Sequence, residues 1–413
     1  MTREIKRFVP TRVYIPLPEG SPVANGLYTA VERGETLVDG TDSLCCRASV
    51  DGLFKGMVGK SDAENHPIMA AMIQTDEQFA LPDREEPAEF DAGRYPPEDI
   101  LAAARQAGII DEMDGRPLID KLMEIRALGR LLVGDAVDDE PYLSSALGLL
   151  YARPLEVERG MALALHATGD GTGCYLVDAT GTDREVGRIR MEKGRKVYRM
   201  RGTYPSRSRM AARMRPVGEP VFIGVAALLH LYRAVVYGDP HTTCFLTVAG
   251  DCIRFPANIE VPVGTLVEDI LWFCGVGSKI DTLVVGGSMR APTAVGGTQV
   301  PVGYTSRAVL AFGPRKEAHF ACIGCGRCVD VCPVGLVPEL ICRKICQADG
   351  EGLEALEPER CIGCGACGYI CPAKVDLVHY IMLAKNRSIP AKNLEGGERD
   401  ADSDAAAADG AAR

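Results

Sequence analysis

The sequence predicts a multidomain protein of mixed α+β and α/β class. Its 413 residues exceed what one hydrophobic core usually organises, because domains commonly hold about 100–200 residues. The spacing of apolar residues, glycines and prolines changes several times along the chain. Two closely similar cysteine runs near the C-terminus form an internal repeat of their own. These observations predict several folded units in a row.

Residues 1–75 are predicted to form a small all-β unit. Short apolar segments at residues 13–15, 37–38 and 47–50 are separated by glycines, as is typical of strands joined by turns. Residues 62–95 contain Pro67, Pro82 and Pro87 and few periodic apolar residues. This stretch is therefore predicted to be a connection with one short helix.

Residues 95–240 are predicted to form a layered α/β domain. Helix-like patterns at 100–105, 117–125 and 228–236 alternate with strand-like apolar runs at 131–133, 161–167 and 221–227. Such alternation is typical of a sheet covered by helices.

Two smaller units follow. Residues 241–313 predict a compact β-grasp module with strands at 244–248, 252–254 and 282–285 and a helix at 266–273. Residues 317–385 hold both cysteine runs, with helices expected at 337–346 and 376–384. Residues 395–413 contain no large apolar side chain and predict a disordered acidic tail.

Composition excludes several functional classes. A net charge of −10 argues against a nucleic-acid partner, which needs a basic face. The N-terminus has no apolar signal core, and no window reaches the ~18 apolar residues of a membrane-spanning helix. We therefore expect a cytoplasmic location. No hydrolase arrangement of Ser, His and Asp is visible in the sequence.

The cysteine runs are the most specific signal. Each has the form C-x2-C-x2-C-x3-C-P, which two-cluster bacterial ferredoxins use to hold two [4Fe–4S] clusters. The last cysteine of each run in such pairs ligates the other cluster. We therefore assign the ligands as Cys322, Cys325, Cys328 and Cys371 for one cluster, and Cys361, Cys364, Cys367 and Cys332 for the second. The alternative, a pair of zinc ribbons, leaves four cysteines per run without a simple tetrahedral assignment.

Eight further cysteines are mostly predicted to be small buried hydrophobes. They are Cys45, Cys46, Cys174, Cys244, Cys252, Cys274, Cys342 and Cys346. Cys342 and Cys346 share one face of a predicted helix and are expected to pack near a cluster. Cys174 ends a glycine-rich stretch, residues 166–174, that predicts a turn; an exposed, reactive thiol there is the alternative.

The order of these segments resembles, nearly end to end, the C subunit of the Rnf ion-pumping electron-transfer complex. The relatives of that family include the cobalamin reductase of propanediol microcompartments and an electron-transfer protein associated with proline reductase. The resemblance implies a barrel-sandwich, lipoyl-like unit at 1–75, a complex-I-flavoprotein-like domain at 95–240 and a ligand-binding (SLBB) β-grasp at 241–313. The motifs that carry it are residues 48–52, 138–143, 248–252, 262–265 and 286–289 and both cysteine runs.

The resemblance also implies a nucleotide site that this chain has altered. The family binds FMN and NADH through a loop of the form G-x-G-G-A-G-F-P, whereas residues 108–118 here contain Asp111, Glu112 and Asp114. A like-charge pair at ~4 Å costs on the order of 4 kcal/mol at an effective dielectric of ~20. Asp135 stands where relatives usually have Asn, although Glu140 and Pro141 remain. We expect NAD(H) binding to be lost and FMN binding to be disfavoured.

A second altered element is arginine-rich. Where relatives carry Tyr-Pro-x-Gly-x-Glu, this chain has Tyr204-Pro-Ser-Arg-Ser-Arg209, flanked by Arg199, Arg201, Arg213 and Arg215. This stretch is either a solvated basic face or a docking patch for an acidic redox protein such as ferredoxin or flavodoxin.

The leading functional hypothesis is an iron–sulfur electron relay. The chain would be the electron-transfer subunit of an anaerobic oxidoreductase system, acting with a reductase or an Rnf-type membrane complex as a hetero-oligomer, free or peripheral at the inner face of the membrane. One alternative is an NAD(P)H:acceptor oxidoreductase that retains FMN. The other is a non-redox assembly scaffold whose clusters are structural.

Overall fold

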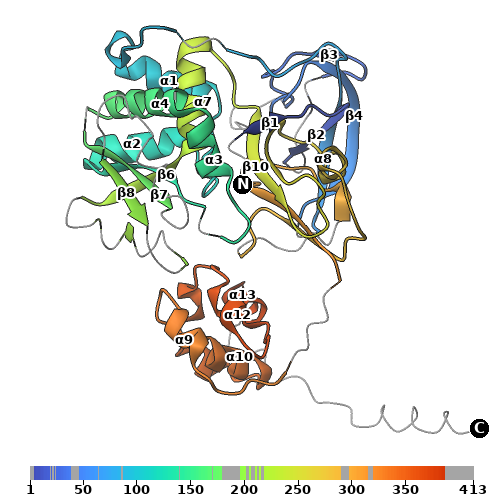
Figure 1. Cartoon of the computed structure of the whole chain (residues 1–413), viewed down its shortest axis with the longest axis vertical. Helices are drawn as coiled ribbons and strands as arrows, with labels where there is room; N and C mark the ends of the chain where they lie inside the picture. Colours follow the sequence, from blue (N-terminus) through green and yellow to red (C-terminus); the bar gives the residue numbers. More distant parts are fainter. Residues whose placement is uncertain are drawn as a thin grey trace, which may run out of the picture. The chain divides into compact units, whose positions relative to one another are not determined.

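The computed structural model contains two compact units, residues 1–315 and 316–413. It describes residues 4–386 except 19, 21–22, 24, 39–45, 64, 85–86, 139, 170, 179–195, 201–203, 206–209, 212–213, 215–217, 290–296 and 315–319. Figure 1 shows that the first unit mixes sheets and helices and that the second is made of short helices. The predicted mixed α/β class is therefore confirmed. The predicted tail, 395–413, lies outside the described residues.

An antiparallel sheet follows the first residues. Its strands run in the order β2-β5-β4-β3, with β2 at Arg12–Leu17, β3 at Ala30–Val31, β4 at Gly52–Ser61 and β5 at Pro67–Thr75. Strand β5 shows that the predicted connection at 62–95 is wrong in its first half. Pro67 misleads, because a proline is tolerated as the first residue of a strand. The predicted short helix is a 3₁₀ turn at Ala92–Arg94.

A parallel sheet with the strand order β8-β7-β6-β9 forms the centre of the α/β part. Its strands are β6 (Leu131–Ala136), β7 (Gly173–Asp178), β8 (Lys196–Met200) and β9 (Pro220–Gly224). Its helices are α1 (Pro97–Gln106), α2 (Leu118–Leu128), α3 (Ser145–Ala152), α4 (Pro154–Ala167) and α7 (Val225–Tyr237). Helices α1, α4 and α7 pack together beside the sheet (Figure 1).

Two strand predictions in this part need correction. Residues 161–167 are the end of α4, and the run at 221–227 is split between β9 and the start of α7. Both helices are buried over most of their surface, so their apolar runs lose the helical period that would separate them from a strand.

The third sheet has the strand order β1-β11-β10-β13-β12. The strands are β1 (Ile5–Arg7), β10 (Thr243–Ala249), β11 (Ala257–Pro262), β12 (Thr282–Val285) and β13 (Ala308–Phe312), beside α8 (Val267–Cys274) and a 3₁₀ turn at Gly297–Gln299. Strands β10 and β12 and helix α8 confirm three predicted elements. Residues 252–254 form a turn, and the second strand is β11. Strand β1, from the start of the chain, pairs in parallel with β11.

The second unit repeats one pattern twice: a cysteine turn, a short helix, a Cys-Pro step and a longer helix. The first copy contains α9 (Arg327–Val331) and α10 (Pro338–Cys346), and the second α12 (Ala366–Ile370) and α13 (Leu377–Asn386). Between them lie α11 (Gly350–Glu354) and a 3₁₀ turn at Pro358–Arg360. Both predicted helices are confirmed. Their small core contains Leu336, Ile341, Leu353 and Ile381.

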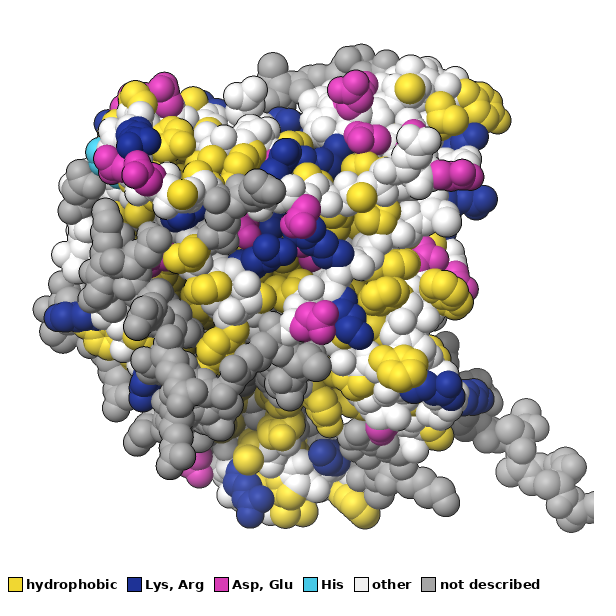
Figure 2. Space-filling model, turned by 45° about the horizontal axis from the view of Figure 1, so that its top comes forward, with side chains coloured by type: hydrophobic (Ala, Val, Ile, Leu, Met, Phe, Trp, Pro, Cys, Tyr) yellow, Lys and Arg dark blue, Asp and Glu magenta, His cyan; other side chains and the backbone are white. Residues whose placement is uncertain are grey.

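The surface carries charges of both signs. On the face drawn in Figure 2, Lys and Arg side chains stand beside Asp and Glu side chains, with hydrophobic side chains between them. Within the described ranges, no helix combines the length and hydropathy needed to cross a membrane.

Candidate cluster sites and nucleotide cavity

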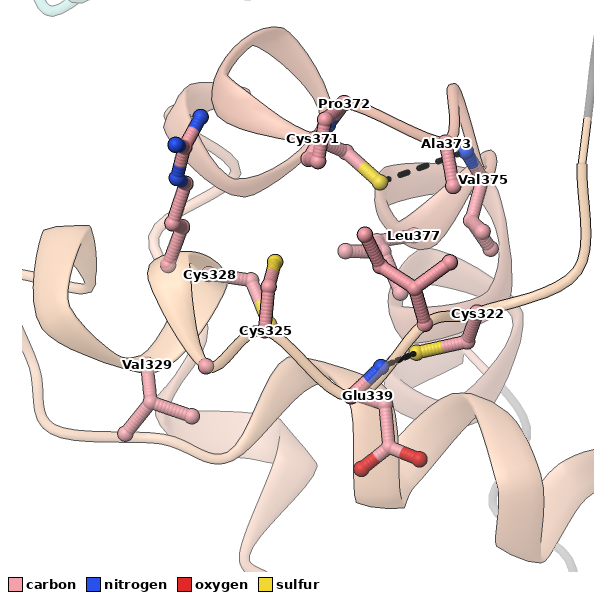
Figure 3. Close-up of a pocket in the computed structure, with 14 residues that line it drawn as sticks. Cys322, Cys325, Cys328, Val329, Glu339, Cys371, Pro372, Ala373, Val375 and Leu377 are labelled. Carbon is pink, nitrogen blue, oxygen red and sulfur yellow. Dashed lines mark hydrogen bonds between the residues drawn. The ribbon is translucent and has the colours of Figure 1, made fainter.

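A pocket in the second unit gathers four cysteines from both runs. Cys322, Cys325 and Cys328 of the first run line it together with Cys371, the last cysteine of the second run. It encloses about 530 Å³, part of it open to solvent. Figure 3 shows Cys371 approaching this space from the side opposite Cys325 and Cys328.

A second pocket gathers the other four. Cys361, Cys364 and Cys367 line it together with Cys332, the last cysteine of the first run, around about 390 Å³ of space. Each pocket thus takes three cysteines from one run and the last from the other. The structure brings together the same two groups of four that the spacing predicts for two clusters.

The backbone of each run explains this exchange. Gly326 and Gly365 have positive φ angles of 75° and 77° and turn the chain into short helices α9 and α12. A residue with a Cβ atom adopts that conformation at an energetic cost. Each short helix carries the fourth cysteine away from its own first cysteine, and the following prolines, Pro333 and Pro372, cannot continue the helix.

Backbone amides donate to the sulfur atoms at matching positions in both repeats. The first cysteine of each run accepts from the amide two residues later, Gly324 to Cys322 and Gly363 to Cys361, both at 3.4 Å. The fourth accepts from the amide four residues later, Leu336 to Cys332 at 3.3 Å and Val375 to Cys371 at 3.4 Å. Figure 3 draws two of these bonds. Such donors favour the thiolate and tune a cluster's potential.

Apolar side chains make up much of the remaining lining, and Arg327 and Glu339 also line the first pocket. Val329, Val375 and Leu377 line the first pocket, and Leu336 and Ile381 the second. Four thiols gathered around one space match the all-cysteine donor set of a [4Fe–4S] cluster. Across the described residues, no three His, Cys, Asp or Glu side chains meet closely enough to hold a single metal ion.

The other cysteines largely behave as predicted. Cys46, Cys174, Cys244, Cys252 and Cys274 are buried, which confirms the prediction for these five, while Cys45 lies outside the described residues. The alternative of an exposed, reactive Cys174 is wrong, because burial raises the pKa of this thiol to about 11. Cys342 is half-buried and Cys346 exposed on α10, and the lining of the two pockets includes neither.

A larger cavity in the first unit brings together two of the segments expected to hold a nucleotide. It encloses about 1350 Å³, part of it open to solvent. Its wall includes Glu112 and Asp114 from the altered loop, Glu140 from the retained acidic motif, and Gly286 and Gly287. The altered loop and the acidic motif both line this cavity, which supports the interpretation that they are parts of one site. Residues 206–209 of the third expected element lie outside the described residues.

The charges in this cavity do not fit a phosphate group. Asp111, a fully buried residue of the loop, accepts from Lys121 Nζ at 2.8 Å and from the Gly224 amide at 3.0 Å. The Glu112 carboxylate accepts from the amides of Ala226 at 2.9 Å and Ala227 at 3.1 Å. These donors are therefore already used by the chain's own carboxylates.

The arginine in the cavity wall is also already paired with a carboxylate. Arg307 lines the cavity but donates to Asp138 at 3.0 Å. Glu140 accepts from the Met289 amide at 2.8 Å, and buried Asp135 accepts from the Val137 amide at 3.0 Å. The cavity thus presents negative charge where a nucleotide needs positive charge or free amides.

The Glu112 carboxylate should give stability a distinctive pH dependence. Burial, and then the charge of Asp111, raises the pKa of Glu112 from 4.5 to about 7. Between these values the folded protein binds more protons than the unfolded chain, so this group makes stability fall as pH rises from 4.5 to about 7. Buried Asp111 contributes with the same sign, because burial raises its pKa too.

We expect Glu112→Gln to flatten this part of the pH profile. Denaturant unfolding of wild type and variant at several pH values between 5 and 8 measures the difference in slope. Equal slopes would show that Glu112 titrates in the folded protein as it does in the unfolded chain.

Most of the arginine-rich stretch lies outside the described residues. This applies to Arg201, Arg207, Arg209, Arg213 and Arg215, whereas Arg199 belongs to β8. The docking hypothesis for this stretch stays a prediction.

Comparison with known proteins bears on both units. Residues 316–384 match the family model described as a 4Fe-4S dicluster domain. The C subunit of the ion-translocating oxidoreductase complex of Vibrio cholerae is 27% identical over 81% of this chain and 47% of its own length. The Rhodobacter capsulatus protein of the same name is 28% identical over 62% of this chain and 53% of its own length.

One further relative and one solved structure are also similar to this chain. The C subunit of the Na(+)-translocating ferredoxin:NAD(+) oxidoreductase complex of Acetobacterium woodii is 29% identical over 50% of this chain and 51% of its own length. A chain of an NAD+-reducing [NiFe]-hydrogenase shares the fold, with a TM-score of 0.50 and 18% identity over 71% of this chain and 63% of that one.

These similarities run through both units of the molecule. The chain spans about half the length of the relatives that it matches over most of its own sequence. It is a homologue of the C subunits of Rnf-type ion-translocating oxidoreductase complexes, with a 4Fe-4S dicluster domain at residues 316–384.

Proposed function

We propose that this chain is an electron-transfer protein that relays electrons through two [4Fe–4S] clusters. The observation that carries the proposal is the gathering of eight cysteines into two pockets, each built from three cysteines of one run and the last of the other. This exchanged arrangement is the one that two-cluster ferredoxins use.

The ligand roles follow from the pockets. Cys322, Cys325, Cys328 and Cys371 would hold one cluster, and Cys361, Cys364, Cys367 and Cys332 the other. Each cluster, when bound, accepts and returns one electron. The protein would supply thiolates and tune the reduction potential with amide donors to sulfur.

The partners would be redox proteins. The named relatives are subunits of ion-translocating oxidoreductase complexes, which supports a role beside a membrane complex or a soluble reductase. A location in the cytoplasm or peripheral at the inner membrane face would suit either partner. Relay requires docking rather than acid–base catalysis by this chain.

Flavin and nicotinamide are not part of the proposed relay. The donors at the cavity of the first unit are occupied by Asp111 and Glu112, which disfavours a phosphate-bearing cofactor there. The cavity itself favours the second candidate, an NAD(P)H:acceptor oxidoreductase with FMN in an altered site, because two of the expected nucleotide-site segments still meet at it.

Anaerobic reconstitution of the full chain tests the proposal. We expect about eight iron and eight sulfide per chain, as two [4Fe–4S] clusters require, and no stoichiometric flavin. Dithionite should produce a cluster EPR signal, and reduced ferredoxin or flavodoxin should reduce the clusters.

Other outcomes select other functions. One FMN per chain with cluster reduction by NADH would favour the oxidoreductase. Clusters that form but take up no electrons would favour the scaffold. A colourless protein after reconstitution would overturn the relay, the oxidoreductase and the scaffold alike, because each of them contains clusters.

A further inference from the structure

The amino-terminal end of α7 contacts Glu112, a residue of the cavity wall in the first unit. This helix, Val225–Tyr237, is 13 residues long and starts directly after strand β9 of the parallel sheet. The first amides of a helix have no partner within the helix, and they carry the positive end of its dipole. Phosphate groups bind at such ends in many nucleotide-binding proteins.

In this chain two neighbouring carboxylates already occupy the position. Glu112 accepts from Ala226 with Oε1 at 2.9 Å and from Ala227 with Oε2 at 3.1 Å. Asp111 accepts from the amide of Gly224, the residue before the helix, at 3.0 Å. The Glu112 carboxylate thus spans two amides with two oxygens, as a bound anion would.

The carboxylate lies directly against the backbone at the start of the helix. A Cβ atom added to Gly224 would stand 2.1 Å from Glu112 Oε1, so only glycine leaves room for this contact. The loop that carries Glu112 is tied down on both sides. Ile110 donates to His241 Nδ1 at 3.1 Å, and the Asp111 and Gly115 amides each close a loop hydrogen bond at 2.9 Å.

The surrounding charges would not attract a further anion. Lys121 Nζ lies 2.8 Å from both Asp111 and Asp114, so it is shared by two carboxylates. Arg307 pairs with Asp138. Asp62 and Glu140 add two more acidic side chains to the wall, and Asp62 pairs with His66.

We propose that Glu112 is a built-in anion that takes the place of a ligand's phosphate at the start of α7 and thereby excludes phosphate-bearing nucleotides from the cavity. Glu112 is then a specificity-determining residue, and the donors that would bind phosphate are intact beneath it. Removing the carboxylate should uncover an anion site. The inference concerns the first unit alone and does not depend on the clusters.

The test compares Glu112→Ala with wild type, using the full reconstituted chain at pH 8, where Glu112 is ionised. The probes are inorganic phosphate, followed by thermal shift, and FMN, followed by equilibrium dialysis. We expect the variant to bind phosphate at least about tenfold more tightly than wild type, because repulsion is removed and amides are freed. Phosphate should raise the melting temperature of the variant and leave that of wild type unchanged.

Asp114→Asn is the matched control. It also removes one negative charge from the same cavity wall, but Asp114 accepts from Arg116 and Lys121 and not from α7. Gain of phosphate binding in Glu112→Ala but not in Asp114→Asn supports a specific occupant. Equal gains in both variants would overturn the proposal in favour of general charge repulsion.

Two further results decide the remaining cases. Stoichiometric FMN binding by wild type, or no gain of anion binding in a folded Glu112→Ala variant, overturns the proposal. If that variant folds only when phosphate or sulfate is present, chemical rescue supports the built-in anion, and failure of rescue counts against it. Iron content and the EPR signal should stay unchanged throughout, which separates this test from that of the relay.

Discussion

Replacing Cys332 and Cys361 together by alanine should leave one complete cluster, with about four iron per chain instead of about eight. These residues come from different runs but line the same pocket, so the other pocket keeps all four of its cysteines. The intact cluster should retain its EPR signal after dithionite. Iron analysis and EPR of anaerobically reconstituted protein measure both quantities.

The double variant Cys322→Ala with Cys332→Ala is the matched comparison. It also removes two cysteines, but from one run and from both pockets, so neither pocket keeps four thiols. We expect it to lose both intact [4Fe–4S] signals. If each run held its own cluster, this variant would keep one cluster and the first would lose both. The two double variants therefore distinguish exchanged from unexchanged ligands without relying on any absolute yield.

The grouping of the cysteines could be predicted because the signal is local. The spacing of the first three cysteines in a run places their thiols on one turn. One short helix then separates the fourth cysteine from that turn. Helices α1, α2, α10 and α13 could also be predicted from the sequence. The periodic spacing of their apolar residues, or a flanking proline, is visible within about ten residues.

Elements that depend on distant partners could not be predicted in this way. Strand β5 forms by pairing with β2 and β4, and its first residue is a proline. The acidic loop was predicted to disfavour phosphate from its own charges, but its contact with α7 joins residues more than a hundred positions apart. No local sequence pattern predicts that a carboxylate will cap a helix that begins more than a hundred residues further along the chain.

Lys121 is a buried residue behind the cavity wall that sequence reasoning missed. It lies on α2 among Leu118, Leu122 and Ile125, on the buried side of the helix. A lone lysine at a core-facing position was the available signal, since a charged side chain is almost never fully buried unless it is paired. Its side chain is 2% exposed, and its ammonium group bonds to Asp111, Asp114 and the Phe222 carbonyl oxygen.

Substitution of Lys121 by methionine should therefore destabilise the first unit by about 3–5 kcal/mol, the range found when one partner of a buried ion pair is removed. Asp111 would remain fully buried, and among the described residues the Gly224 and Met113 amides would be its remaining donors. Asp114 is 44% exposed and can be hydrated instead, so most of the loss should come from Asp111. Denaturant unfolding followed by circular dichroism measures the difference.

The double variant Lys121→Met with Asp111→Asn is the control that isolates the unpaired charge. It removes both charges and keeps similar side-chain volumes, so it should recover much of the stability lost in the single variant. Burial already raises the pKa of Asp111 in the wild type, with Lys121 opposing the shift. Without the lysine, the deficit should shrink as pH falls and Asp111 becomes protonated. A deficit that is independent of pH, and unchanged in the double variant, would instead assign the loss to packing around α2.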